Sequence, residues 1–126
     1  GYGVYAYGRY GDYPGDLYEG SYYGGLRQGT GVYRYQGSED RLGGVYLGEW
    51  MKGRMVGSGI LTYSDGETYI GNWVNDKKDG QGVYTWGSMS GQVAGDKYEG
   101  TFRQGGAHGY GRTLFADGGW HKGRYA

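Results

Sequence analysis

A short pattern, Tyr-x-Gly-x-aromatic, recurs along the chain and limits its possible folds more than any other feature. Its copies are YEGSY (18–22), YLGEW (46–50), YIGNW (69–73), YEGTF (98–102) and the degenerate HKGRY (121–125). A Gly-x-Gly pair begins seven residues after the last aromatic of each of the first four copies. Because this unit recurs every 23 to 29 residues with constant internal spacing, it indicates a repeat array in which each unit packs against its neighbours.

Each unit is predicted to be a β-hairpin. In the unit that begins at Tyr69, the side chains of Tyr69, Gly71 and Trp73 share one face of a strand, because successive side chains point to opposite faces. A charged turn follows, and the second strand is expected to place Gly82 opposite Gly71. The same uniform register would place Trp73 opposite Gly80.

The glycines are expected to leave room for aromatic rings, in a chain with 32 glycines and 17 tyrosines. Glycine inside a strand costs ~0.5–1 kcal/mol relative to alanine. A buried ring removes roughly 150–250 Å² from water, at about 25 cal/mol per Å², so ring burial outweighs the glycine cost. The predicted fold class is all-β: an elongated single-layer antiparallel sheet of stacked β-hairpins with a groove-like aromatic face.

The repeat boundaries divide one array of 126 residues. A half unit covers residues 1–7, full units begin at residues 18, 46, 69 and 98, and a second half unit covers 121–126. We therefore expect the chain to be part of a longer array. Two longer links, 36–45 and 87–97, alternate with shorter ones, and this alternation predicts that both inserts lie on the same edge of the sheet.

Several function classes are disfavoured by composition. There is no cysteine, which excludes disulfides and thiol catalysis, and the two histidines have no obvious carboxylate at metal-ligand spacing. Thirteen basic and thirteen acidic residues leave no net field to attract nucleic acid. No catalytic constellation is present. We expect no enzymatic activity, no cofactor, no metal and no nucleic-acid partner.

The repeated units, with their constant aromatic and glycine spacing, resemble MORN (membrane occupation and recognition nexus) repeats over nearly the whole chain. Departures are His121 at the first tyrosine position, and Tyr22, Phe102 and Tyr125 at the tryptophan position. The resemblance implies a scaffold with protein partners in a larger assembly. It also implies an intracellular location in a cytoskeletal, ciliary or membrane-peripheral assembly.

The leading functional hypothesis is a non-catalytic interaction module whose aromatic groove receives a segment of a partner protein. Rings with little conformational entropy to lose are typical of docking sites. The predicted partner-binding residues are Tyr18, Tyr33, Tyr46, Trp50, Tyr63, Tyr69, Trp73, Tyr84, Trp86, Tyr98, Phe102 and Phe115.

The alternative is peripheral binding to anionic phospholipid, which the family name also implies. Basic residues gather between the last aromatic of a unit and its Gly-x-Gly pair, on the edge opposite the long links. The predicted lipid-binding residues are Arg27, Lys52, Arg54, Lys77, Lys78 and Arg103. Each cation near an anionic surface contributes about 1 kcal/mol. The same charges are also typical of solvated loops that protect sheet edges from aggregation.

Overall fold

The computed structural model describes residues 1–7, 15–38, 42–88 and 93–125, which form strands, turns and connecting segments and no helix. The strands, in chain order, are β1 (Tyr2–Ala6), β2 (Leu17–Tyr23), β3 (Leu26–Tyr35), β4 (Gly44–Met51), β5 (Arg54–Tyr63), β6 (Thr68–Val74), β7 (Lys77–Thr85), β8 (Lys97–Arg103), β9 (Gly106–Leu114) and β10 (Trp120–Tyr125).

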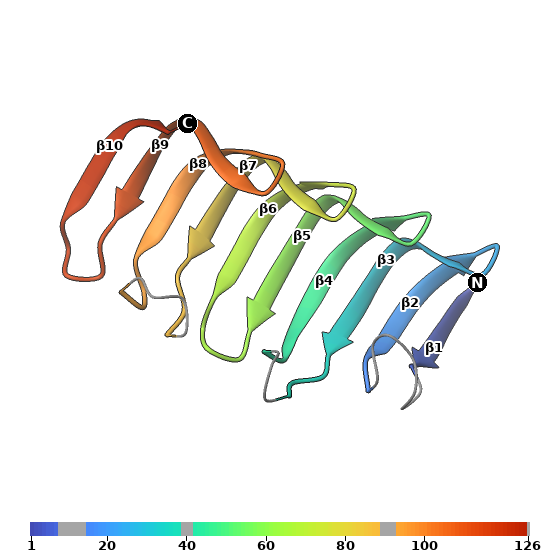
Figure 1. Ribbon diagram of the computed structural model, residues 1–126. Coiled ribbons are helices and arrows are strands. Elements are labelled where there is room, and N and C mark those ends of the chain that lie inside the picture. Colours follow the sequence, from blue (N-terminus) through green and yellow to red (C-terminus); the bar gives the residue numbers. More distant parts are fainter. Residues whose placement is uncertain (8–14, 39–41, 89–92, 126) are drawn as a thin grey trace.

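All ten strands lie side by side in one antiparallel sheet, in the order of the sequence. Figure 1 shows a single layer in which β1 and β10 form the two ends. The tight turns within the units lie along one edge, and the connections between units lie along the other. The predicted fold class is confirmed. The two inserts join β3 to β4 and β7 to β8 on that second edge, although residues 39–41 and 89–92 are outside the described part of the chain.

The glycine register predicted within the hairpins is confirmed, but the prediction for Trp73 is wrong. Gly71 lies opposite Gly82. The equivalent pairs are Gly20–Gly31, Gly48–Gly59 and Gly100–Gly111. Trp73, however, pairs with Lys78 and not with Gly80, because the register shifts by two residues just after the glycine pair. The same shift occurs at the same place in the other three full hairpins.

The first glycine of each Gly-x-Gly pair builds this β-bulge. Its φ is positive in every unit, at 91° for Gly29, 60° for Gly57, 95° for Gly80 and 74° for Gly109. Glycine adopts this region without steric cost, whereas other residues rarely do. The first glycine is therefore required by the bend of the backbone and not by a ring that lies over it.

The second glycine seats the ring of the first tyrosine. A Cβ atom added to Gly82 would lie 2.5 Å from the Tyr69 ring, closer than any side chain can pack. The Tyr69 ring extends across this glycine. Its hydroxyl donates a hydrogen bond to the carbonyl of Asn72, opposite the bulge, at 2.8 Å. The hydroxyls of Tyr18, Tyr46 and Tyr98 donate in the same way to the carbonyls of Ser21, Glu49 and Thr101.

Neighbouring units pack through a continuous row of edge-to-face rings. Ring centroids are 4.7 to 5.5 Å apart along the series Tyr18, Trp50, Tyr46, Trp73, Tyr69, Phe102, Tyr98 and Tyr125. The Trp73 indole also donates to the Gly59 carbonyl of the preceding unit at 3.4 Å. Such ring pairs contribute ~0.5–1.5 kcal/mol each beyond the area they bury. The hydrophobic core therefore lies on one face of a single sheet.

The opposite face of the sheet carries no such core. Its central row consists of cross-strand neighbours, and Leu47, Ile60 and Ile70 in this row are exposed. We call the face with the ring row the aromatic face and the other the reverse face.

Replacing Gly82 by alanine is expected to lower the free energy of unfolding by roughly 1–3 kcal/mol, because the added methyl group must displace the Tyr69 ring or the backbone. Urea denaturation followed by circular dichroism measures this change. Gly106→Ala is the matched control, because its Cβ would contact only the Arg103 carbonyl at 4.0 Å. Equal stability of the two variants would contradict the proposed ring seat.

Candidate functional site

Most of the predicted partner-binding rings are buried in the core. The buried residues are Tyr18, Tyr33, Tyr46, Trp50, Tyr69, Trp73, Tyr98 and Phe102. Tyr63, Tyr84 and Trp86 are half-buried, and Phe115 is 38% exposed. The rings cover one another through their edge-to-face contacts, so the aromatic face is much less open than the sequence suggested. Partner binding by the twelve residues remains a prediction. Of the twelve, Tyr63, Tyr84, Trp86 and Phe115 expose the largest part of their side chains.

A row of partly exposed rings follows the edge at which the units are linked. Each unit supplies one ring at the end of its second strand or just after it. This ring lies two residues beyond the position paired with the first tyrosine. The members are Tyr7, Tyr35, Tyr63, Trp86 and Phe115, which we call the outer row. Tyr7 and Tyr35 were missed by the sequence analysis, although alignment of the units on Gly-x-Gly places them with Tyr63 and Trp86.

A second position, five residues after the last aromatic of each unit, determines how the aromatic face is filled. Its occupants are Arg27, Met55, Lys78 and Ala107, each paired with that aromatic in the hairpin. We call this the filling position. The Met55 side chain is buried in the core. Comparison of the four units reveals this position, whereas a search for charges or rings alone does not.

Arg27 shows what a cation does at the filling position. Its guanidinium lies 5.1 Å from the centre of the Tyr33 ring and 4.7 Å from that of Trp50, which indicates cation–π contacts. It also donates to the Tyr7 hydroxyl at 2.8 Å and to the Gly53 carbonyl at 2.9 Å. Arg27 is thus part of the aromatic face, and lipid binding by this residue stays a prediction.

Lys78 occupies the same position two units further on. Its ammonium lies 5.7 Å from the centre of the Tyr69 ring and 5.3 Å from that of Tyr84. Burial lowers the pKa of this ammonium, and the charge of nearby Glu67 acts in the opposite direction. Lys78 therefore also faces the rings, and lipid binding by this residue stays a prediction.

At Ala107 the filling position is nearly empty, and an open pocket of about 290 Å³ lies beside it. Its walls are formed by Lys78, Tyr84, Trp86, Tyr98, Phe102, Gly105, Ala107 and Tyr125. The Tyr84 and Trp86 rings meet edge to face with centroids 5.3 Å apart. A second pocket, of about 250 Å³, lies between Arg27 and Asp76 and includes Tyr35 of the outer row.

Two acid–phenol pairs, one buried and one half-buried, support the linked edge of the aromatic face. The Tyr33 hydroxyl donates to Asp16 Oδ2 at 2.6 Å, and the Tyr84 hydroxyl donates to Glu67 Oε1 at 2.5 Å. Burial raises the pKa of both phenols above the ordinary value, and the carboxylate acceptors raise it further. Asp16 also accepts from the Gln36 backbone N–H at 2.8 Å, so this acidic residue is structural.

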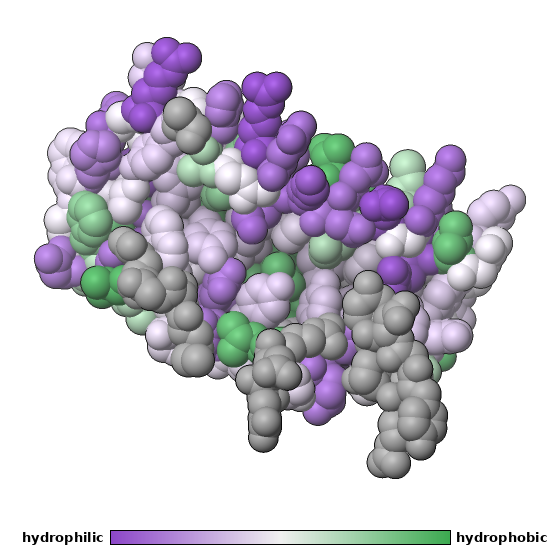
Figure 2. All heavy atoms as spheres, viewed as in Figure 1, coloured by the Kyte–Doolittle hydropathy of each residue, from purple (hydrophilic) through white to green (hydrophobic). Residues whose placement is uncertain are grey.

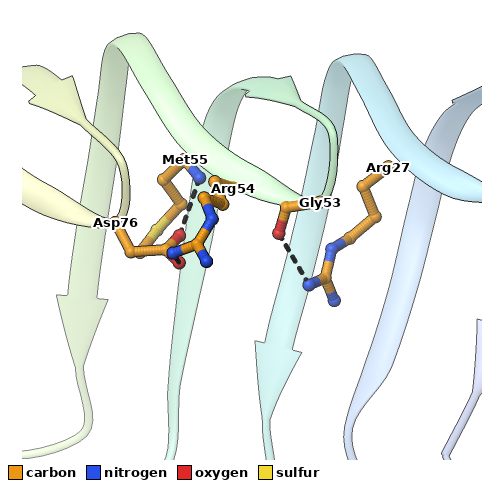
Figure 3. A network of polar contacts seen from close by, with 5 residues as sticks. All are labelled: Arg27, Gly53, Arg54, Met55 and Asp76. Carbon is orange, nitrogen blue, oxygen red and sulfur yellow. Dashed lines mark hydrogen bonds and ion pairs between the residues drawn. The ribbon is translucent and has the colours of Figure 1, made fainter.

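The turn edge retains part of the predicted basic character. Figure 3 shows Arg54 beside Asp76, with a nitrogen–oxygen distance of 3.6 Å, and Arg27 bonded to the Gly53 carbonyl. The Asp76 carboxylate also accepts from the Met55 backbone N–H at 2.8 Å. These contacts tie neighbouring turns together and engage two of the six predicted lipid-binding cations.

Three exposed cations on this edge alternate with exposed apolar side chains. The cations are Lys52, Lys77 and Arg103, and the apolar residues include Tyr23, Met51 and Val74, exposed by 78%, 52% and 52%. Hydrophilic side chains gather along the upper edge of the molecule in Figure 2, where Figure 1 places the turns. We call these six residues the turn-edge set.

The described ranges contain neither a cluster of metal ligands nor a membrane-spanning helix. Residues 1–7, 15–38, 42–88 and 93–125 contain no group of three or more His, Cys, Asp or Glu side chains placed to hold a metal ion. Within the same part of the chain, no helix is long and apolar enough to cross a membrane.

Stacked two-strand units on a common frame of rings and glycines define a β-hairpin repeat protein. The sequence profile of the MORN repeat matches residues 18–38, 46–68, 69–88 and 98–120, more than half of the chain. The chain therefore belongs to the MORN repeat family, whose repeats are non-enzymatic modules of protein and membrane interaction. A search of curated proteins found no match.

The buried phenols predict a cooperative loss of structure in alkali. Burial raises the pKa of Tyr69 to about 12, and the pKa values of Tyr46 and Tyr84 are also raised by burial. These groups bind protons more tightly when folded, so their stabilisation is complete below about pH 10 and is lost as the pH rises toward the folded values. Tyrosinate absorbance and far-ultraviolet circular dichroism should change together. Full ionisation before any loss of strand signal would contradict the packing.

Proposed function

We propose that the chain is a scaffold module that binds an extended segment of a partner protein along the outer row. The observation that carries this proposal is one partly exposed ring in each unit, from Tyr7 to Phe115, beside two open pockets. Rings of low conformational entropy next to pockets are favourable anchors for a partner.

The spacing of the units suggests the conformation of that segment. Neighbouring strands lie roughly 4.8 Å apart, so each hairpin advances the outer row by about 10 Å. An extended chain covers about 3.3 Å per residue, and one unit therefore corresponds to about three residues of partner. The centroids of Tyr35 and Tyr63 are 6.3 Å apart, close enough for one bound side chain to contact both rings.

Photo-crosslinking tests this proposal directly. A benzoylphenylalanine at position 63 is expected to crosslink to a discrete set of protein segments in cell extract, because Tyr63 lies in the outer row. The matched control carries the same group at position 70, since Ile70 is exposed on the reverse face. Mass spectrometry identifies the crosslinked peptides. Equal products from both positions would overturn the proposal. Substitution of the buried Trp50 or Trp73 is unsuitable, because it would test the core instead.

A second proposed function, peripheral binding to anionic phospholipid, is favoured by the turn-edge set. Lys52 and Lys77 project charge from the same edge that exposes Met51 and Val74. Cations beside apolar side chains are the combination by which surface-bound proteins contact lipid headgroups and the acyl boundary. The turn edge and the outer row lie on opposite edges of the sheet, so the two functions are compatible.

Vesicle flotation separates this function from the first. Wild-type protein is expected to float with vesicles of phosphatidylcholine and phosphatidylserine, less so at high salt, because exposed charges are screened. Lys52→Glu combined with Lys77→Glu should abolish flotation. Lys122→Glu, on an exposed side chain of β10, is the charge control and should float like wild type. Wild-type protein that stays with the soluble fraction at low salt would exclude the lipid function.

A further inference from the structure

The pocket beside Ala107 lies where the filling position carries its shortest side chain. Arg27 and Lys78 extend long side chains from the filling position over rings of their own units, Tyr33 and Tyr69. Met55 at the same position is buried in the core. Ala107 pairs with Phe102 as these residues pair with their own aromatics, but it ends at Cβ. The pocket beside Ala107 has a volume of about 290 Å³, whereas the pocket lined by Arg27 and Met55 has a volume of about 250 Å³. The short Ala107 side chain thus leaves a larger space over the rings.

The neighbouring unit contributes the positively charged side chain of Lys78 to the wall of this pocket. The Lys78 ammonium lies over the Tyr69 and Tyr84 rings, and within the described ranges it has neither a hydrogen-bond acceptor nor an ion-pair partner. Glu67, the nearby carboxylate that acts on its pKa, already accepts a hydrogen bond from the Tyr84 hydroxyl. A half-buried ammonium without a counterion favours an anionic partner.

We propose that this pocket binds an apolar side chain of a protein segment whose adjacent carboxylate pairs with Lys78. The proposal rests on the proposed scaffold function and specifies the chemistry of one contact on its path. The rings of Trp86, Tyr98 and Tyr125 supply the apolar walls. The volume of about 290 Å³ is at the lower limit of small-molecule sites, and it suits one side chain better than a lipid tail.

The side chain that would bind in the Ala107 pocket can be inferred from the residues at the filling position of the other units. Met55 shows that a thioether fits the ring frame, and Arg27 shows that a cation also does. At Ala107, a cation would lie beside Lys78 and be repelled, so a neutral side chain followed by an acid is favoured. Methionine next to a carboxylate satisfies both conditions, and N-acetylmethionine is a small probe that carries both groups without a free ammonium.

Titration with N-acetylmethionine, followed by amide and indole NMR shifts, tests the proposal. The shifts of Gly105, Ala107 and the Trp86 indole are expected to move, and N-acetylmethioninamide should bind roughly tenfold more weakly because it lacks the charge. Lys78→Met keeps the aliphatic stem and should remove the difference between the two probes. Lys77→Met is the matched control, because Lys77 is exposed on the next residue, and it should retain the difference.

A second variant tests the pocket independently of charge. Ala107→Met places the Met55 side chain at the equivalent position, so it should fill the pocket, raise the melting temperature and block both probes. Equal binding of acid and amide by wild-type protein, or unchanged binding by Ala107→Met, would overturn the proposal. If N-acetylmethionine fails to bind while crosslinks at position 63 persist, the proposal for the pocket is wrong and the scaffold function is retained. If the probe binds but the crosslinks specific to position 63 are lost, the scaffold function is wrong and the pocket is retained as a binding site.

Discussion

The contact between the first tyrosine ring and a cross-strand glycine pair is the interaction on which the rest of the structure depends. The Tyr69 ring occupies space that a Cβ atom at Gly82 would need, and its hydroxyl reaches the Asn72 carbonyl on the far side of that glycine. The bulge at Gly80 brings about the bend at this point. Ring, glycine and bulge therefore depend on one another, and the same set recurs in each full unit.

This interaction explains how one sheet layer can hold a hydrophobic core. A sheet normally buries one face against a second layer. Here the first tyrosine of each full unit lies flat enough for the last aromatic of the next unit to meet it edge to face, as Tyr46 and Trp73 do at 5.4 Å. The rings thus act as the second layer. Since each ring contacts both its own unit and the next, stability is shared between neighbours along the array.

The fold could be predicted from sequence because the glycine and aromatic spacings are constant. The pairing of Gly71 with Gly82 followed from alternation alone. Alternation could not reveal that Gly80 adopts a positive φ, since a bulge leaves no periodic signal, and Trp73 was therefore placed opposite the wrong residue. The site was harder to predict. Trp50 and Trp73 were expected to line an open groove because a single layer was assumed to leave its rings uncovered, but edge-to-face packing covers them.

The four units also show how such an array separates folding from recognition. The ring and glycine positions are almost the same in every unit, whereas the filling position holds Arg27, Met55, Lys78 or Ala107. The backbone register around this position does not change with its occupant. A substitution there alters the charge and depth of one pocket while the ring row stays in place. Because each of the two pockets is lined by residues of several neighbouring units, the order of units along the chain sets the order of chemical environments that an extended partner would meet.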